Sequence, residues 1–576
     1  MSAVPIFPPA VSSAPIAAKR LNRTILTVHG LLEKWAMETP DKIALQDSEC
    51  SMTFAQWHRA SEHLASRLQT AGVEKGTLVG VQVGRTCGLP VAFTAVSKVG
   101  ARFLGLNPSW LSEDREMVFT RWDKRFILCW EGMEIGGWKA STLLPFGASD
   151  ILSPALSPQG SPRVDTFDEF YMNVTSGSTG LPKVAVTTHR ELMINTASVC
   201  EDLELTTDDV LMSLFGVIGH PHEIFMRGLY LGATTVLEPS VYPRQHIHMI
   251  TQHGVTFLMG LPPQLDALSR LASREDADVS SLRIVETGGM RVTDRFLASF
   301  EERTGEKVTP VWGSTETSGV VLTGDPGIVG FSSVVFGYSI QLRDGNAIIK
   351  DNGRGELWIS GEGIVNRYLG ERSDSSEVLV DGWYKTGDIF TRRGERLYFT
   401  GRRGGLIKAS GLKVYPSEVE LAVLKHPSVR DVCVVGKEMP GRGEAPVAYI
   451  VLRGGVELSI HDLRSFLSNI LEDFKMPRKY FFVLGLPRTI SGKLDRSRIG
   501  RQDIAPDFRA ELLRMDVDLV KLLNIRADLM ERIDAGYNPN WVEEQINNAM
   551  GHNPGPLSDS IVREVIRFIM NNLGRG

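Results

Sequence analysis

Residues 171–189 read YMNVTSGSTGLPKVAVTTH, and the rest of the chain is organised around this stretch. The apolar residues before position 175 predict one strand, and Val184 to Val186 predict another. No residue from 175 to 180 is larger than threonine, so these residues cannot fill a core. Small residues let backbone N–H groups surround an anion, and Lys183 adds a positive charge after the turn. We therefore predict a strand–loop–strand that binds polyphosphate; it differs from the Walker motif, whose loop opens a helix.

The alternative interpretation of this stretch is a flexible surface hairpin, although linkers seldom place a Pro-Lys pair directly after hydroxyl-rich glycines. The sequence TSGSTGLPK also resembles the phosphate loop of the adenylate-forming superfamily, which comprises acyl- and aryl-CoA ligases, adenylation domains of peptide synthetases and luciferases. Further stretches match this superfamily in the same order from about Leu26 to Arg496. The resemblance implies that the loop binds ATP through Thr175, Ser176, Gly177, Ser178, Thr179, Gly180 and Lys183.

The length and composition indicate a large protein with more than one core. The chain has 576 residues, of which 42% are hydrophobic, and this is enough for two or more domains. The formal net charge is −5, from 63 basic and 68 acidic residues, so no basic excess favours a nucleic-acid partner. The five cysteines lie far apart without a C-x-x-C pair, which is typical of a reducing compartment, and we interpret them as buried fillers.

Residues 1–25 are expected to form a disordered tail, because four prolines interrupt any apolar run that would act as a signal sequence. No run of about eighteen apolar residues follows, so no membrane span is expected. Together with the cysteine pattern, these features predict a location in the cytoplasm.

The segments after the tail alternate between extended and helical patterns. Residues 79–83 predict a strand and residues 89–99 predict a helix. Such alternation favours an α/β fold with a largely parallel sheet. We predict a large α/β domain with several subdomains over residues 26–400. By the same resemblance, a small mobile α+β domain spans residues 401–505; an all-helical domain over residues 506–576 is predicted separately below.

Two later stretches resemble the part of the superfamily that binds the nucleotide. The resemblance assigns the adenine side to Gly288, Gly289, Trp312 and Gly313. In this set the glycines let a planar group approach the backbone, and the indole can stack on a purine. In the same motif, Thr315 can donate to the α-phosphate, and Glu316 can hold Mg²⁺, a hard ion that prefers carboxylate and phosphate oxygens.

Four residues further along match functional positions of the superfamily. Asp388 in YKTGD is assigned to the ribose, whose hydroxyls a carboxylate accepts, and Arg402 matches an arginine that contacts ribose and phosphate. Gly404 falls at the hinge between the domains, where glycine permits a large change of backbone angles. Lys493 matches the catalytic lysine, whose ammonium stabilises the negative charge that gathers when a carboxylate attacks the α-phosphorus.

The acid side of the site departs from the superfamily pattern. A Pro-Leu-Phe-His-x-x-Gly loop usually lies beside the carboxylate substrate, but here Ser213 and Gly216 replace the proline and the histidine. His220 follows shortly and is a candidate for the acid pocket, as is Gly319. A metal site built on the two histidines of this loop, His220 and His222, would need a third ligand that nothing nearby supplies. Gly411 lies in the segment that lines the pantetheine path in the superfamily.

The residues after position 505 extend beyond the usual end of the superfamily. Leucines recur at helical spacing from Phe508 to Ile533, and the extension resembles the all-helical chorismate mutase family. Arg509 and Arg526 keep the spacing of two arginines that hold the dianionic substrate there, but Tyr537 and Trp541 replace other functional residues. Because binding two carboxylates needs several cations, we expect an appendage for dimerisation or partner contact. Packing of the leucines against the small domain is the alternative.

The predicted function is an AMP-forming ligase that uses ATP, Mg²⁺ and a small carboxylic acid. An acyl-adenylate forms first, and coenzyme A then takes the acyl group. The mutase-like tail favours an aromatic acid. A carrier-protein thiol or an amine is the alternative acceptor. A second alternative is a non-catalytic nucleotide-binding scaffold that acts through the helical tail, although Lys493, Glu316, Asp388 and Arg402 are all present.

Overall fold

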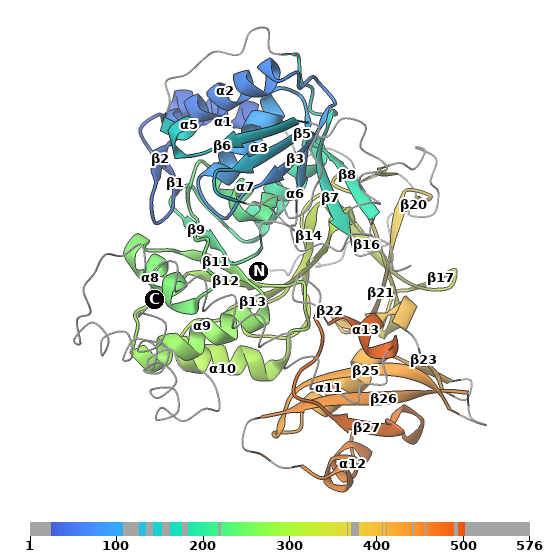
Figure 1. Cartoon of the computed structure of the whole chain (residues 1–576). Coiled ribbons are helices and arrows are strands. Elements are labelled where there is room, and N and C mark those ends of the chain that lie inside the picture. Colours follow the sequence, from blue (N-terminus) through green and yellow to red (C-terminus); the bar gives the residue numbers. More distant parts are fainter. Residues whose placement is uncertain are drawn as a thin grey trace, which may run out of the picture. The chain divides into compact units, whose positions relative to one another are not determined.

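The structure is a computed structural model. It describes residues 25–106, 126–133, 142–152, 162–175, 183–216, 221–365, 367–369, 379–405, 407–409, 412–439, 443–453, 456, 458–488 and 494–501. The chain divides into two compact units (Figure 1). The first comprises Met1–Gly405 and Thr489–Lys493, and the second comprises Leu406–Arg488 and Leu494–Gly576. The predicted disordered tail over residues 1–25 lies outside the described residues except for residue 25, and the predicted helical domain over residues 506–576 lies wholly outside them.

The largest sheet described in the first unit has nine strands in the order β15-β14-β13-β12-β11-β9-β10-β1-β2. Its central strands, from β13 to β1 in this order, pair in parallel, and antiparallel strands complete both edges. Because parallel strands all end at the same edge, this sheet collects the loops that follow β9, β11, β12 and β13. The strands are β1 (Ile43–Gln46), β2 (Ser51–Thr53), β9 (Val210–Ser213), β10 (Thr234–Val236), β11 (Phe257–Gly260), β12 (Ile284–Thr287), β13 (Val308–Ser314), β14 (Gly319–Thr323) and β15 (Ser333–Val334).

A second sheet carries the phosphate-loop motif. Its described strands follow the order β19-β8-β7-β4-β3-β5-β6. The strands are β3 (Leu78–Gln82), β4 (Arg102–Gly105), β5 (Phe126–Trp130), β6 (Thr142–Phe146), β7 (Glu169–Thr175), β8 (Lys183–Thr188) and β19 (Arg367–Tyr368). Strands β7 and β8 pair antiparallel with Thr175 opposite Lys183. Both predicted strands of the strand–loop–strand are therefore confirmed, whereas residues 176–182 lie outside the described residues.

A third sheet, antiparallel throughout its described part, follows the order β17-β16-β18-β21-β20, with β22 paired to β21. Its strands are β16 (Tyr338–Asp344), β17 (Ala347–Ile349), β18 (Gly353–Gly361), β20 (Leu379–Val380), β21 (Trp383–Arg393) and β22 (Arg396–Arg402). The register of β21 and β22 places Asp388 opposite Arg402, so backbone pairing alone brings these two predicted site residues together.

Helices join the strands of the two larger sheets. Those described are α1 (Val28–Glu38), α2 (Phe54–Thr70), α3 (Gly88–Lys98), α5 (Ala148–Leu152), α6 (His189–Asp202), α7 (Pro221–Leu231), α8 (Pro243–His253), α9 (Pro262–Glu275) and α10 (Asp294–Thr304), with short 3₁₀ turns η1 (Thr315–Thr317) and η2 (Arg403–Gly405). Helix α6 begins directly after β8 with a capping box, in which Thr188 Oγ1 accepts from the Glu191 amide and Glu191 Oε2 accepts from the Thr188 amide. The strand–helix alternation confirms the predicted α/β class.

Aromatic side chains fill the core beneath α1, α2 and α3. The Phe93 ring lies 4.7 Å from the Phe170 ring, 4.8 Å from the Phe103 ring and 5.1 Å from the Phe225 ring, measured between centroids. All four side chains are fully buried. Burial of each such ring stabilises the fold by about 1.5–3 kcal/mol relative to its exposure. The core therefore joins β4, β7, α3 and α7 into one body.

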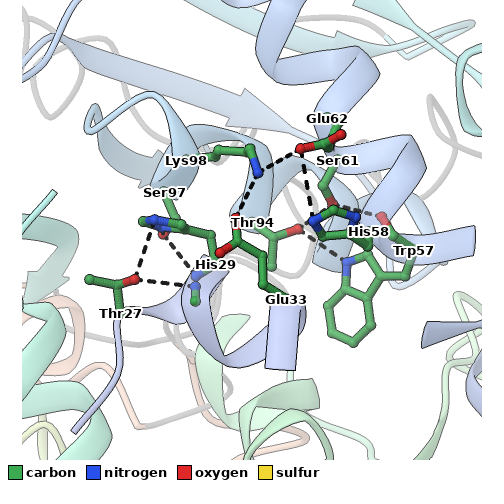
Figure 2. Close-up of polar contacts among 11 residues, drawn as sticks. Thr27, His29, Glu33, Trp57, His58, Ser61, Glu62, Thr94, Ser97 and Lys98 are labelled. Carbon is green, nitrogen blue, oxygen red and sulfur yellow. Dashed lines mark hydrogen bonds and ion pairs between the residues drawn. The ribbon is translucent and has the colours of Figure 1, made fainter. Parts of the chain in front are cut away.

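A network of polar side chains also connects α1, α2 and α3 (Figure 2). Lys98 Nζ lies 2.7 Å from Glu33 Oε1 and 2.7 Å from Glu62 Oε1, so one ammonium joins all three helices. His29 Nδ1 lies 2.8 Å from Ser97 Oγ, and burial lowers the pKa of His29 to about 4. We call these five residues the α1–α3 network. Its charges are paired within the protein, and its imidazole is neutral at neutral pH.

The second unit, described by itself, is a small α+β body. Its described strands follow the order β24-β23-β26-β25, with β27 paired to β26. The elements are β23 (Ile407–Ala409), β24 (Leu412–Val414), α11 (Pro416–Leu424), β25 (Val429–Met439), β26 (Gly443–Leu452), α12 (Ile460–Ser468), η3 (Asp473–Lys475), β27 (Lys479–Phe482) and α13 (Arg496–Arg501). Glu420, fully buried on α11, pairs with the Arg496 guanidinium at 2.6 Å, which ties α13 to this unit.

Among the described helices, none combines the length and apolar character needed to cross a membrane.

Candidate nucleotide and acid site

Asp388 is the centre of a polar group built by three strands. Its Oδ2 accepts from the Trp312 indole Nε1 at 3.0 Å, and its Oδ1 accepts from Arg402 Nε at 2.7 Å. The carboxylate is buried, and Asp388 chiefly raises the pKa of Arg402. These bonds fix the carboxylate in one orientation. Two ribose hydroxyls are donors of the kind that such an oriented carboxylate binds.

Glu316 lies on the tight turn that joins β13 to β14. The turn is closed by Thr317 Oγ1, which donates to the Gly319 carbonyl at 2.7 Å, and by the Tyr338 hydroxyl, which donates to the Thr317 carbonyl at 2.9 Å. Gly319 has a φ of +136°, and a Cβ there would lie 2.3 Å from Asn195 Oδ1. Only glycine fits at position 319, so the closure of the turn explains why a glycine stands there.

The adenine-side residues lie where neighbouring strands end. Gly288 and Gly289 follow β12, and a Cβ on Gly288 would lie 2.7 Å from the Val311 side chain of β13. Gly313 is equally restricted, because its Cβ would lie 2.2 Å from the Gly319 carbonyl oxygen. The structure therefore brings the turn after β12 against β13, which also carries Trp312. A flat, apolar-faced group suits such a backbone surface.

A tyrosine that the sequence motifs did not select connects two predicted site residues. The Tyr368 hydroxyl donates to Glu316 Oε1 at 2.8 Å. The Lys183 ammonium lies 4.8 Å from the centroid of the same ring. Tyr368 lies in the two-residue strand β19, which pairs with β8 and places the ring beside the strand that carries Lys183. Lys183 of the phosphate-loop motif and Glu316, the predicted magnesium ligand, thus both contact the Tyr368 side chain.

The surroundings of Glu316 suit a hard cation held together with phosphates. Tyr368 orients one carboxylate oxygen, and within the described part of the chain no partner is found for the other, Oε2. Burial raises the pKa of the neighbouring Tyr384 phenol, and the Glu316 carboxylate raises it further, so this phenol stays protonated. Mg²⁺ is commonly bound by one or two carboxylates and by substrate phosphates, and a single acidic ligand such as Glu316 fits that pattern.

The segment after β9, where the superfamily pattern breaks, is held by side chains from distant parts of the chain. The buried Arg85 guanidinium donates to the carbonyls of Ser213 at 3.4 Å and Phe215 at 3.3 Å. Gln264 Nε2 donates to the Leu214 carbonyl between them at 2.8 Å. Three successive carbonyls therefore have side-chain donors, which fixes this segment without regular secondary structure.

The remaining predicted site residues divide into those that the structure describes and those that lie outside the described residues. Thr315 lies in η1 beside Glu316, and Gly404 lies in η2 at the end of the first unit. The candidates outside the described residues are Ser176, Gly177, Ser178, Thr179, Gly180, His220, Gly411 and Lys493.

The prediction that all cysteines are buried fillers is wrong for Cys50, which is only partly buried. Its neighbour in sequence, Ser51, opens the short strand β2 at the sheet edge, and this position reaches solvent.

Comparison with known protein families identifies the class of this chain. Residues 32–369 match the family described as AMP-binding enzyme, and residues 418–493 match the AMP-binding enzyme C-terminal domain. The first match spans more than half of the chain. The chain belongs to the AMP-binding enzyme family. The predicted membership of the adenylate-forming superfamily is therefore confirmed for both matched segments of this AMP-binding enzyme.

Individual relatives of this AMP-binding enzyme are acid–CoA ligases. An indoleacetate–CoA ligase from Aromatoleum aromaticum is 27% identical over 505 residues, which cover 82% of this chain and 97% of that relative. A medium-chain fatty-acid–CoA ligase from Escherichia coli is 28% identical over 514 residues, which cover 82% of this chain and 89% of that relative. The o-succinylbenzoate coenzyme A synthetase from Bacillus subtilis, solved with ATP and a magnesium ion, has a TM-score of 0.73 and 25% identity, covering 81% of this chain and 98% of that one. These similarities confirm the predicted class, an adenylate-forming ligase.

Proposed function

We propose that this AMP-binding enzyme activates a carboxylic acid with ATP and then transfers the acyl group to coenzyme A. A carboxylate oxygen attacks the α-phosphorus, and the bond from that phosphorus to the bridging oxygen of pyrophosphate breaks. Acyl-adenylate and pyrophosphate are the products. The thiol sulfur of coenzyme A then attacks the acyl carbon, the thiol proton is lost, and AMP leaves with the electrons of the broken C–O bond.

Within the structure, the observation that supports this proposal most directly is the oriented carboxylate of Asp388. It is buried and is bonded to Arg402 and to Trp312, which lies in the segment that matches the family. The relatives described above are acid–CoA ligases. We therefore favour the ligase over the scaffold alternative.

Each predicted residue has a role in this reaction. Asp388 and Arg402 bind the ribose, and Thr315 donates to the α-phosphate. Glu316 would hold Mg²⁺, which neutralises phosphate charge when bound. Lys493 places an ammonium on the oxygens that gain charge as the carboxylate attacks, and such a charge has a large effect where water is excluded. The residues that bind the outer phosphates are Thr175, Ser176, Gly177, Ser178, Thr179, Gly180 and Lys183.

The acid and the acceptor are assigned from weaker signals. We infer an aromatic carboxylic acid, because an indoleacetate–CoA ligase and an o-succinylbenzoate synthetase are among the similar proteins. His220 and Gly319 are proposed for the acid pocket, Gly411 for the pantetheine path, and Gly404 for the hinge that turns the second unit between the two half-reactions. A carrier-protein thiol or an amine stays the alternative acceptor.

The extension over residues 506–576 is proposed to be a helical appendage that joins two copies of the chain. Its support is the apolar stripe and the resemblance to a mutase family whose members interlock as helical dimers. Light scattering on the full chain and on a chain ending at Pro506 tests this, because the full chain is expected to have twice the mass of the truncated one. Equal oligomeric states would contradict it. Location in the cytoplasm stays a prediction from the cysteine pattern.

The proposed function is tested by incubating the purified protein with ATP, Mg²⁺ and a panel of aromatic, aryl-alkyl and aliphatic acids. We expect AMP and pyrophosphate to form with one acid class, and acyl-CoA to accumulate when coenzyme A is added. AMP formation that is insensitive to coenzyme A but accelerated by hydroxylamine would favour another acceptor. Absence of AMP with every acid would contradict the proposal.

A further inference from the structure

Strand β19 is only two residues long, and side chains rather than strand length hold it in place. Arg367 pairs with Val186 of β8 in register, and the Leu369 amide donates to the Val184 carbonyl at 2.7 Å. The Arg367 guanidinium also bonds Glu169, with Nε to Oε1 at 2.8 Å. Arg367 stands where the superfamily commonly has glycine. This ion pair fixes the strand, and with it the next residue, Tyr368, against the hairpin that carries the phosphate-loop motif.

Tyr368 is buried, and its two ends contact two different charged groups. Its hydroxyl donates to the Glu316 carboxylate at 2.8 Å, and its ring lies 4.8 Å from the Lys183 ammonium. A second link runs along the backbone, because the Val365 amide donates to the Glu316 carbonyl at 2.9 Å. Glu316 lies in η1 between β13 and β14, Lys183 begins β8 of another sheet, and Tyr368 contacts both side chains.

We propose that Tyr368 is a positioning residue for the ATP–Mg²⁺ complex, an inference that rests on the proposed function. The phenol hydroxyl holds Glu316 in the rotamer that directs its second oxygen to the cation. The aromatic face holds the Lys183 ammonium toward the phosphates through a cation–π contact. Both charged groups are thereby oriented before the nucleotide arrives, so ordering them costs less free energy on binding.

A purely structural role for Tyr368 makes a different prediction. The ring also packs with Ala185 and Val365 in a small apolar cluster. Tyr368→Phe keeps this packing and the cation–π face, and removes only the hydroxyl bonded to Glu316. Tyr368→Leu removes the aromatic face as well. The two variants therefore separate the link to the cation ligand from the link to the ammonium.

The test measures ATP binding by isothermal titration calorimetry on the full chain, without any acid, at a series of Mg²⁺ concentrations. We expect Tyr368→Phe to raise the Mg²⁺ concentration for half-maximal ATP affinity about tenfold, because a hydrogen bond to a charged group is lost, and to leave affinity at saturating Mg²⁺ within about twofold. Tyr368→Leu should weaken ATP binding even at saturating Mg²⁺, by about threefold to tenfold.

Tyr338→Phe is the matched control. Its buried hydroxyl donates to the Thr317 carbonyl at 2.9 Å, so this variant loses a phenol bond to the same turn without touching the Glu316 carboxylate. Its Mg²⁺ dependence should match that of the wild type. The inference is overturned if Tyr368→Phe leaves the Mg²⁺ dependence unchanged, or if Tyr338→Phe shifts it equally. Failure of the proposed function has another signature, namely wild-type protein that binds ATP–Mg²⁺ but forms no AMP with any acid.

Discussion

The α1–α3 network and the nucleotide site are both groups of polar side chains in the first unit, but their charges are balanced differently. In the network, the Lys98 side chain is 10% exposed and bonds two carboxylates of the protein (Figure 2). In the site, the Asp388 side chain is 3% exposed, whereas that of its partner Arg402 is 64% exposed. The first group is complete without a ligand. The second leaves the Arg402 guanidinium exposed to solvent beside the buried Asp388 carboxylate, which favours stabilisation of a bound substrate over stabilisation of the fold.

The largest effect is expected at Lys493, the last residue of the second matched segment and the proposed catalytic lysine. Lys493→Ala should reduce acid-dependent pyrophosphate exchange by about 10³-fold, because it removes the ammonium that stabilises the transition state. ATP binding should change little. Lys479→Ala, at an exposed position of β27, is the control and should retain full exchange. Near-normal exchange in Lys493→Ala would refute the assignment.

A smaller but clear effect is expected at the centre of the site. Asp388→Asn keeps the shape of the side chain and removes its charge, so kcat/KM for ATP should fall by roughly 10–100-fold. The thermal midpoint should shift by no more than about 3 °C, because the Arg402 partner is exposed to water and is not left buried without a counter-charge. Steady-state kinetics and calorimetry check the two parts. A large loss of stability with unchanged kcat/KM would place Asp388 with the structural groups.

The opposite pattern is expected in the network. Lys98→Met leaves Glu33 and Glu62 without their shared cation, and both are partly exposed, so the free energy of unfolding should fall by about 2 kcal/mol. Urea denaturation measures this loss, and kcat/KM should stay unchanged. Lys34→Met, which breaks an exposed pair with Glu38, serves as the control and should cost less than about 0.5 kcal/mol. A kinetic defect in Lys98→Met would erase the contrast between the two regions.

The smallest expected effect concerns pH. Burial lowers the pKa of His29 to about 4, below the value near 6.5 expected in the unfolded chain. Between these two values the unfolded state binds more protons, so the contribution of His29 to stability is present above pH 6.5 and is lost as the pH falls toward 4. The slope is at most about 1.4 kcal/mol per pH unit.

Urea midpoints of the wild type and of His29→Gln between pH 7.5 and pH 5 check this prediction. The wild type should lose stability more steeply than the variant. Glu33, His58 and Lys98 are the charged or titratable groups that act on His29, and Lys98 and His58 reinforce the effect of burial while Glu33 opposes it. Equal slopes in both proteins would show that His29 is not responsible.

The site was predictable from the sequence wherever a role belongs to a short motif. Trp312, Thr315 and Glu316 all lie within five consecutive residues, and a motif of this kind can be recognised without knowledge of tertiary contacts. Asp388 and Arg402 were each selected from their own motif, and the register of two strands that follow one another in the sequence explains their pairing. The class of fold was predictable for a similar reason, because strand and helix patterns alternate over much of residues 26–314.

The contacts that orient these motifs were not predictable from the sequence. Tyr368 lies 52 residues after Glu316, in a two-residue strand that no periodicity reveals. Arg85 reaches carbonyls 128 and 130 residues away, and a guanidinium that donates to backbone oxygens leaves no complementary side chain to detect. The α1–α3 network has the same character, since its residues occur at ordinary helix positions. Such long-range hydrogen bonds require the three-dimensional structure.

The most direct measurement follows the oxygen of the acid. The protein is supplied with ATP, Mg²⁺, coenzyme A and an accepted carboxylic acid labelled with ¹⁸O in both carboxylate oxygens, and the AMP product is analysed by mass spectrometry. Formation of an acyl-adenylate predicts one ¹⁸O atom in each AMP, because the oxygen that attacks the α-phosphorus stays there when the acyl group leaves. Unlabelled AMP, or label found in inorganic phosphate or pyrophosphate, would contradict the account.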